Sequence, residues 1–141
     1  MNRVIVDTGP LVAYLLSDEQ HHAWTVERFS TLPPPFLTCE AVLSEACFVL
    51  ARGGGDPDAL WELVERGLIQ VSFRLTDEIA DIRQLMRKYL DVPMSFADAC
   101  LVRMTEQLTD CVVVTLDSHF RIYRRHGRKV IPVFLPKLNG R

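Results

Sequence analysis

Two aspartates directly follow apolar segments that are typical of buried strands. Asp7 comes after Val4–Val6, and Asp117 comes after the apolar run 111–116. In open α/β sheets, functional sites lie beyond the carboxyl ends of the parallel strands. If the two strands are parallel, both carboxylates therefore lie at one edge of the sheet, although Asp at either position is also a good turn or N-cap residue. Asp110 precedes its strand and is expected at the opposite edge, about 20 Å away.

A third acid, Glu45, lies in the segment 39–51, whose pattern indicates a helix. Its neighbours one turn away on such a helix are all apolar, namely Ala41, Val42, Phe48 and Val49. No Lys or Arg lies within one turn in the sequence. A carboxylate on an apolar face is costly unless a metal or a distant basic residue compensates its charge, or unless it lies at the rim of the core.

The fourth acid, Asp98, has two interpretations. It follows Ser95 by three residues, which is the spacing of a capping box at the start of a helix. It also has Met94, Leu101 and Val102 at one-turn spacing. We therefore expect Asp98 to face the apolar side of a helix over 95–108.

Carboxylates gathered in one pocket repel one another, and some are driven to hold protons. Mg²⁺ and Mn²⁺ relieve this repulsion, because hard divalent cations prefer oxygen ligands. Such a metal lowers the pKa of a bound water and neutralises charge on a phosphate, so the expected chemistry is hydrolysis of phosphodiester bonds. We therefore take Asp7, Glu45, Asp98 and Asp117 as candidate catalytic and metal-binding residues.

Apolar strands alternate with helical segments along the chain. We expect strands over 4–6, 36–38, 68–73, 111–116 and 129–133, and helices over 11–16, 20–30, 39–51, 76–90 and 95–108, with one more helix opening at Asp56-Pro57. Nearly continuous apolar strands in this order indicate a parallel sheet covered on both faces. The length of 141 residues suits one such α/β domain, and the chain shows no internal repeat or linker.

The composition is typical of a soluble globular protein, with 48% hydrophobic and 24% charged residues. The net charge of -2 argues against binding nucleic acid through charge alone, although a local basic patch can accompany an acidic metal site. No signal peptide pattern and no apolar stretch of roughly 20 residues is present, so we expect a cytoplasmic protein without a membrane span. The four cysteines form no CxxC pair and are interpreted as reduced core residues.

Four segments of the chain resemble the PIN domains of VapC-like toxins. They are VDTGPLVAYL at 6–15, EAVLSEACFVLAR at 40–52, SFADACLVRM at 95–104 and VVVTLDSHF at 112–120. The resemblance covers essentially the whole chain, 1–141, as a single PIN domain. It implies a three-layer α/β sandwich, with a central, mostly parallel sheet of about five strands flanked by helices.

The resemblance also implies an activity and partners. It implies a metal-dependent endoribonuclease that uses Mg²⁺ or Mn²⁺ held by the acidic residues named above, and that is the toxin of a type II toxin–antitoxin pair. The partners implied are an RNA substrate, a cognate antitoxin protein and a second copy of the chain in a homodimer. Thr115 matches the hydroxyl residue two positions before the last Asp, and Thr8 lies beside Asp7, so both are candidates to support the acids through hydrogen bonds.

A basic segment follows Asp117 in the sequence. Arg121, Arg124 and Arg125 lie there, interleaved with Phe120 and Tyr123. Arginines of this kind bind phosphates and aromatic rings stack on bases, so the arginines are candidate RNA contacts. An ordinary solvated helix face is an equally good interpretation of the same pattern.

Two other functions remain open from the sequence. A phosphatase with Asp7 as covalent nucleophile shares the Asp at the strand end, but enzymes similar to haloacid dehalogenases carry a second Asp two residues later, where this chain has Gly9. An RNA- or protein-binding module without catalysis would be marked by loss of one or more acids, and none is lost here.

Overall fold

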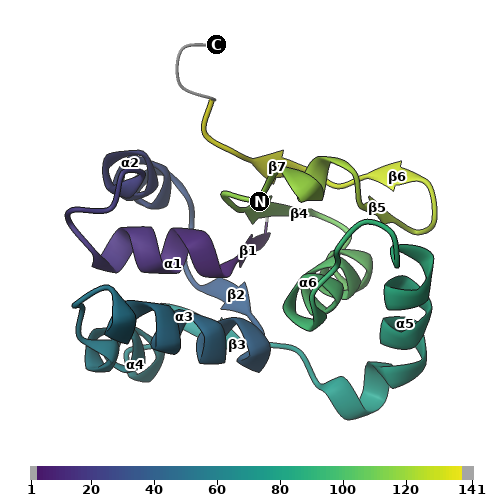
Figure 1. Ribbon diagram of the computed structural model, residues 1–141, viewed down its shortest axis with the longest axis horizontal. Coiled ribbons are helices and arrows are strands. Elements are labelled where there is room, and N and C mark those ends of the chain that lie inside the picture. Colours follow the sequence, from purple (N-terminus) through teal and green to yellow (C-terminus); the bar gives the residue numbers. More distant parts are fainter. Residues whose placement is uncertain (1–2, 138–141) are drawn as a thin grey trace.

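The computed structural model describes residues 3–137. Its main sheet has five parallel strands in the order β3-β2-β1-β4-β7. The strands are β1 (Arg3–Val6), β2 (Phe36–Thr38), β3 (Ile69–Val71), β4 (Cys111–Val114) and β7 (Val133–Phe134). The helices are α1 (Thr8–Leu15), α2 (His22–Thr31), α3 (Glu40–Arg52), α4 (Pro57–Glu65), α5 (Leu75–Lys88) and α6 (Phe96–Gln107). In Figure 1 the strands run down the middle of the molecule, with α1 to α4 on one side and α5 and α6 on the other.

The two central strands explain the apolar runs in the sequence. β1 pairs in parallel with β4, and Val4, Ile5 and Val6 lie opposite Val112, Val113 and Val114. All of these residues are buried, as expected for a strand covered on both faces. From β1 the chain adds β2 and β3 on one side and later β4 and β7 on the other, so the order of strands reverses between β1 and β4. Sites in open α/β sheets form at this position.

The structure confirms the predicted α/β sandwich and corrects its last segment. The predicted strand over 129–133 is divided at Pro132 into β6 (Lys129–Val130) and β7. β6 pairs in antiparallel fashion with β5 (Arg124–Arg125) in a small separate hairpin, whereas β7 joins the main sheet beside β4. Proline has no N–H to donate to a strand ladder, so the chain changes partner there.

The four cysteines lie in the core or pack against it. Cys39, Cys100 and Cys111 are buried, Cys47 is half-buried, and all are free thiols. Among the helices of residues 3–137, none is long and apolar enough to cross a membrane.

Candidate active site

The four predicted acids line a single hollow at the carboxyl ends of the central strands. Asp7 follows β1, Glu45 lies on α3, Asp98 lies in the first turn of α6, and Asp117 lies just beyond β4. The rest of the lining comes from Thr8, Gly9, Val49, Ser95 and Leu116. Asp110 lies at the start of β4, where its backbone carbonyl accepts a hydrogen bond of 2.7 Å from Arg3 N–H, so its exclusion from the site agrees with the strand directions.

Asp7 is the most deeply placed of the acids. It is the N-cap of α1, and its Oδ1 accepts a hydrogen bond of 2.7 Å from Thr8 N–H. Its Oδ2 accepts a second hydrogen bond of 2.7 Å from the Thr115 hydroxyl. Burial raises the pKa of Asp7 from its ordinary value of 3.8 to about 6, against the lowering effect of these hydrogen bonds and with some help from the charges of Asp98 and Asp117. The carboxyl group therefore holds a proton more readily than an exposed aspartate does.

The hydroxyl of Thr115 joins two of the acids. It donates to Asp7 and accepts a hydrogen bond of 2.9 Å from Asp117 N–H, and the side chain is completely buried. Thr8 behaves differently, because only its backbone contacts the Asp7 carboxylate. Its buried hydroxyl oxygen has no hydrogen-bond partner within the described part of the chain.

Asp98 satisfies both interpretations of its sequence position. Ser95 Oγ accepts a hydrogen bond of 3.0 Å from Asp98 N–H, and Asp98 Oδ2 accepts one of 3.1 Å from Ser95 N–H, which completes a capping box. The same residue is nevertheless buried and lines the hollow. Burial raises its pKa, opposed mainly by the bond from the Ser95 backbone.

Asp117 and Glu45 are more open to solvent. Asp117 Oδ1 accepts a hydrogen bond of 2.9 Å from His119 N–H and lies 2.9 Å from His119 Nδ1, at the start of the short 3-10 helix η1 (Ser118–Arg121). Glu45 is exposed, and its apolar neighbours Phe48 and Val49 are 61% and 38% exposed. Of the three environments expected for Glu45, the structure shows the rim of the core.

The PIN domain family model matches residues 4–125 of the chain. The chain belongs to the PIN domain family. A solved structure with a similar fold is that of VapC20 from Mycobacterium tuberculosis, described as a toxin that cleaves the sarcin-ricin loop. The two share 18% sequence identity at a TM-score of 0.72, over 82% of this chain and 90% of that one. No curated protein matches the chain in sequence.

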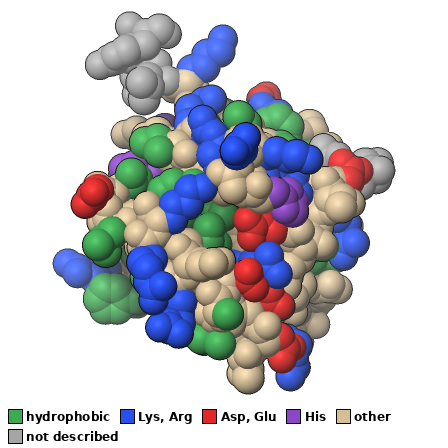
Figure 2. All heavy atoms as spheres, turned by 90° about the vertical axis from the view of Figure 1, so that its right-hand side faces the viewer, with side chains coloured by type: hydrophobic (Ala, Val, Ile, Leu, Met, Phe, Trp, Pro, Cys, Tyr) green, Lys and Arg blue, Asp and Glu red, His purple; other side chains and the backbone are tan. Residues whose placement is uncertain are grey.

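The arginines of this PIN domain do not all fit the predicted RNA contacts. Arg125 is buried, and its guanidinium donates to the backbone carbonyls of Thr105 and Leu108, so the prediction of a phosphate contact at Arg125 is wrong. Arg124 is half-buried and turns back onto the carbonyl of Arg121 at 2.7 Å. Arg121 itself is exposed. Figure 2 shows that Lys and Arg side chains gather over the upper part of the face that carries α5 and the β5–β6 hairpin.

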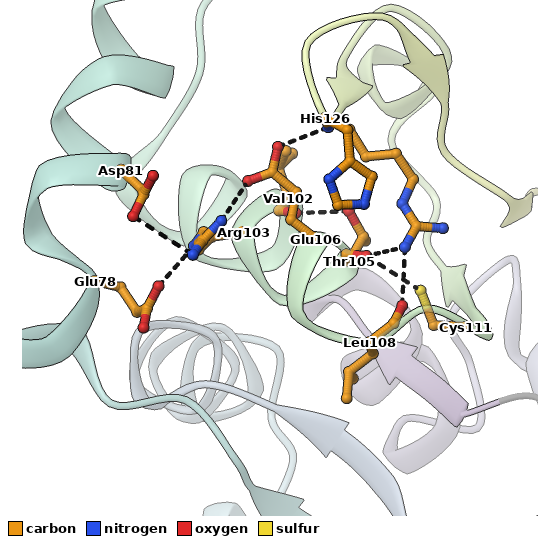
Figure 3. A network of polar contacts seen from close by, with 10 residues as sticks. Glu78, Asp81, Val102, Arg103, Thr105, Glu106, Leu108, Cys111 and His126 are labelled. Atoms are coloured by element: carbon orange, nitrogen blue, oxygen red, sulfur yellow. Dashed lines mark hydrogen bonds and ion pairs between the residues drawn. The ribbon is translucent and has the colours of Figure 1, made fainter.

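Arg125 belongs instead to a polar network around α6, where it donates to Thr105 and Leu108. Figure 3 shows this network, with Arg103 and its acidic partners labelled. At its centre Arg103 contacts Glu78 at 2.6 Å, Glu106 at 3.0 Å and Asp81 at 3.5 Å. Glu106 in turn accepts a hydrogen bond of 2.8 Å from the backbone N–H of His126 in the hairpin. The network therefore ties α5 and the hairpin to α6, the helix that carries Asp98.

The donor set of the PIN domain hollow suits a hard cation. Its ionisable side chains are all carboxylates, the ligands that Mg²⁺ and Mn²⁺ prefer. Within residues 3–137, no three His, Cys, Asp or Glu side chains are already arranged around one ion position. Mg²⁺ is commonly held by one or two carboxylates together with water and substrate phosphate, which does not require such a preformed set.

Tyr123 is a site residue that the sequence did not identify as one. Its hydroxyl lies 3.1 Å from Asp98 Oδ2, and its side chain is completely buried. Burial, followed by the charge of Asp98, raises the pKa of the phenol, which therefore stays protonated as a donor near neutral pH. The two residues are 25 positions apart, and no local pattern in the sequence links them.

Proposed function

We propose that this PIN domain is a metal-dependent endoribonuclease, the toxin of a type II toxin–antitoxin pair, acting on RNA in the cytoplasm. The observation that supports this most is the meeting of four carboxylates, from four separate segments, in one hollow at the β1–β4 switch point. A binding module without catalysis has no need for this arrangement. Buried acids with raised pKa values stabilise the folded protein less than neutral residues would, so their presence favours a chemical role.

The carboxylates of Asp7, Glu45, Asp98 and Asp117 would hold the cation. Mg²⁺ or Mn²⁺, when bound, supplies an activated water at neutral pH and offsets negative charge on the scissile phosphate. The chain's own contribution is orientation. The Thr115 hydroxyl and Thr8 N–H each donate to one oxygen of Asp7, and His119 N–H donates to Oδ1 of Asp117. The carboxylates of Asp7 and Asp117 are therefore set in place before a cation or an RNA strand arrives.

The solvent-facing side of the site would bind the substrate. We propose that Arg121 contacts a phosphate of RNA, because it is exposed and lies four residues beyond Asp117 on η1. Arg124 would contribute less, since its guanidinium already donates to three backbone carbonyls. The likeness to VapC20 makes the sarcin-ricin loop the first RNA to test as a substrate.

A phosphatase with an aspartate nucleophile fits the structure poorly. A Cβ built at Gly9 would lie only 3.0 Å from Leu116 Cδ1 and 3.2 Å from its Cβ. A second Asp at this position would therefore displace Leu116, which lines the same hollow.

The experiment is cleavage of total RNA, including ribosomal RNA, by the purified protein with Mg²⁺, with Mn²⁺ and with EDTA. Asp98→Asn serves as the inactive variant, and Asp110→Asn is the matched control at the other end of β4. We expect discrete fragments that require metal, persist in D110N and vanish in D98N. Metal-independent cleavage, or equal cleavage by D98N, would refute the proposal.

The partners proposed from the family are a cognate antitoxin and a second copy of the chain. Exposed large apolar side chains on α3, α4 and α5, among them Phe48, Trp61 and Ile79, support the homodimer. Sedimentation of the purified protein tests it, and Ile79→Lys should shift the distribution towards monomer. Growth arrest that is relieved by coexpression of the neighbouring gene would support the antitoxin.

A further inference from the structure

The side chain of Tyr123 is fixed by an aromatic cluster. Its ring packs edge-on against Tyr89 and Phe120, with ring centroids 5.1 Å and 5.2 Å away, and stacks at 6.4 Å from His119. Tyr123 and Phe120 are the two largest completely buried side chains of the protein's described part. A ring held on several sides has little freedom to rotate, so the hydroxyl at its tip has a defined position.

That hydroxyl lies between two acceptors. It is 3.1 Å from Asp98 Oδ2 and 3.1 Å from the backbone carbonyl of Pro93, in the turn before α6. Asp98 Oδ2 also accepts the hydrogen bond from Ser95 N–H. Oδ2 thus faces two donors, Ser95 N–H and the Tyr123 hydroxyl, whose single proton is shared with the Pro93 carbonyl. Within the described residues no hydrogen bond involves the other carboxylate oxygen, Oδ1. The carboxylate cannot rotate without giving up both bonds, which leaves Oδ1 as the oxygen available in the hollow.

We propose that Tyr123 is a positioning residue of the metal site, which holds the Asp98 carboxylate in the orientation that binds the cation. This inference rests on the proposed function, because it assumes that Asp98 is a metal ligand. Groups that orient metal ligands through hydrogen bonds commonly change metal affinity or activity by about 10- to 100-fold when removed. Tyr123 follows Asp117 closely in sequence, so one short segment supplies an acid and also orients another on α6.

The chain supplies a matched control at Tyr89. Tyr89 is also buried, its ring packs against Tyr123, and its hydroxyl accepts a hydrogen bond of 2.8 Å from Arg124 N–H. Within residues 3–137, its hydroxyl makes no hydrogen bond to an acid of the hollow. Tyr123→Phe and Tyr89→Phe therefore each remove one buried hydroxyl from the same cluster and keep the ring, but only the first removes a bond to a carboxylate.

The test is Mn²⁺ binding without RNA, followed by calorimetry or electron paramagnetic resonance, for the wild type, Y123F, Y89F and D98N. We expect about tenfold weaker binding by Y123F, a larger loss in D98N, and binding by Y89F within about twofold of the wild type. In RNA cleavage, high Mn²⁺ should restore kcat in Y123F but not in D98N, while the KM for RNA stays unchanged in Y123F.

The outcomes separate this inference from the proposed function. Equal binding by wild type and D98N would refute the metal site and the role of Tyr123 with it. Weak binding by D98N with full binding by Y123F would refute only the positioning role. Equal losses in Y123F and Y89F would overturn it as well, because the cause would then be packing of the cluster.

A second measurement uses the wild-type protein, in case Y123F does not fold. With ¹³C-labelled tyrosine, Mg²⁺ should move the Cζ resonance of Tyr123 much further than that of Tyr89. The Tyr123 shift should disappear in D98N. A Tyr123 resonance that does not respond to Mg²⁺ in a protein that binds the ion would contradict the proposal.

Discussion

Replacing Asp7 with Asn should change the stability of the metal-free protein in a way that depends on pH. Burial raises the pKa of Asp7 from 3.8 to about 6, so the folded protein binds this proton more tightly than the unfolded chain does. The contribution of the protonated Asp7 to the free energy of unfolding is therefore fully present below about pH 4, and it is lost as the pH rises through about 6. The raised pKa therefore costs the folded protein about 3 kcal/mol of stability near pH 8, and about 0.5 kcal/mol near pH 4.

Asn removes this cost but loses a hydrogen bond. Its amide has one oxygen, which can accept from Thr8 N–H or from the Thr115 hydroxyl but not in the geometry of both. The lost bond costs about 1 kcal/mol at every pH. Asp7→Asn should thus stabilise the protein by about 2 kcal/mol near pH 8 and destabilise it slightly near pH 4.

The assay is urea unfolding in EDTA, for the wild type, D7N and the control D110N, at intervals from pH 4 to pH 8. The free energy difference between D7N and wild type should change by about 2.5 kcal/mol across this range and reverse its sign. A difference that stays constant with pH would show that the pKa of Asp7 is not raised, and would refute the reasoning from burial. Saturating Mg²⁺ should stabilise the wild type more than D7N.

Three further predictions concern side chains outside the buried acids. Glu45→Ala should change the unfolding free energy without metal by less than about 0.5 kcal/mol, because Glu45 is exposed, yet it should abolish metal-dependent RNA cleavage; a large change in urea midpoint would contradict this. Arg103→Ala should destabilise by about 2 kcal/mol in urea unfolding, since it leaves Glu78 and Glu106 half-buried without their cation, whereas an unchanged midpoint would show that the network is only a surface feature. Arg125→Ala should likewise lower stability by about 2 kcal/mol, because it removes a donor from the Thr105 carbonyl and leaves the Leu108 carbonyl without one. Arg121→Ala should instead weaken RNA binding at low salt and leave the melting temperature unchanged; a stability loss in Arg121→Ala together with an RNA-binding loss in Arg125→Ala would contradict these assignments.

The acids at the sheet edge were predictable because their positions depend on strand direction alone. An apolar run followed by Asp places that Asp at the carboxyl end of a buried strand, and parallel pairing of β1 with β4 then brings Asp7 and Asp117 together. Asp98 was predictable for a related reason, since both its capping box and its apolar neighbours are local in sequence.

Features that depend on packing between distant segments were not predictable. Arg125 lies in a segment of arginines and aromatic residues, a pattern that suits RNA contacts. Its guanidinium points inwards only because the hairpin packs against α6. In the sequence, Tyr123 is only an aromatic residue in a basic segment. Its contact with the site depends on α6, which brings Asp98 to its hydroxyl. For Glu45 the sequence left three environments open, because helical periodicity places Phe48 and Val49 on one face but does not show that this face is exposed.

The hydroxyl of Thr115 has a consequence for when the acidic hollow is completed during synthesis. It joins Asp7 to the backbone of Asp117 across 108 residues of sequence. β1 is the central strand, and it obtains its β4 neighbour only after most of the domain has been made. Any fragment that ends before β4 therefore lacks an acid, the hydroxyl that orients Asp7 and half of the pairing of β1. A nascent chain therefore completes the acidic hollow only after β4 and Asp117 have been made.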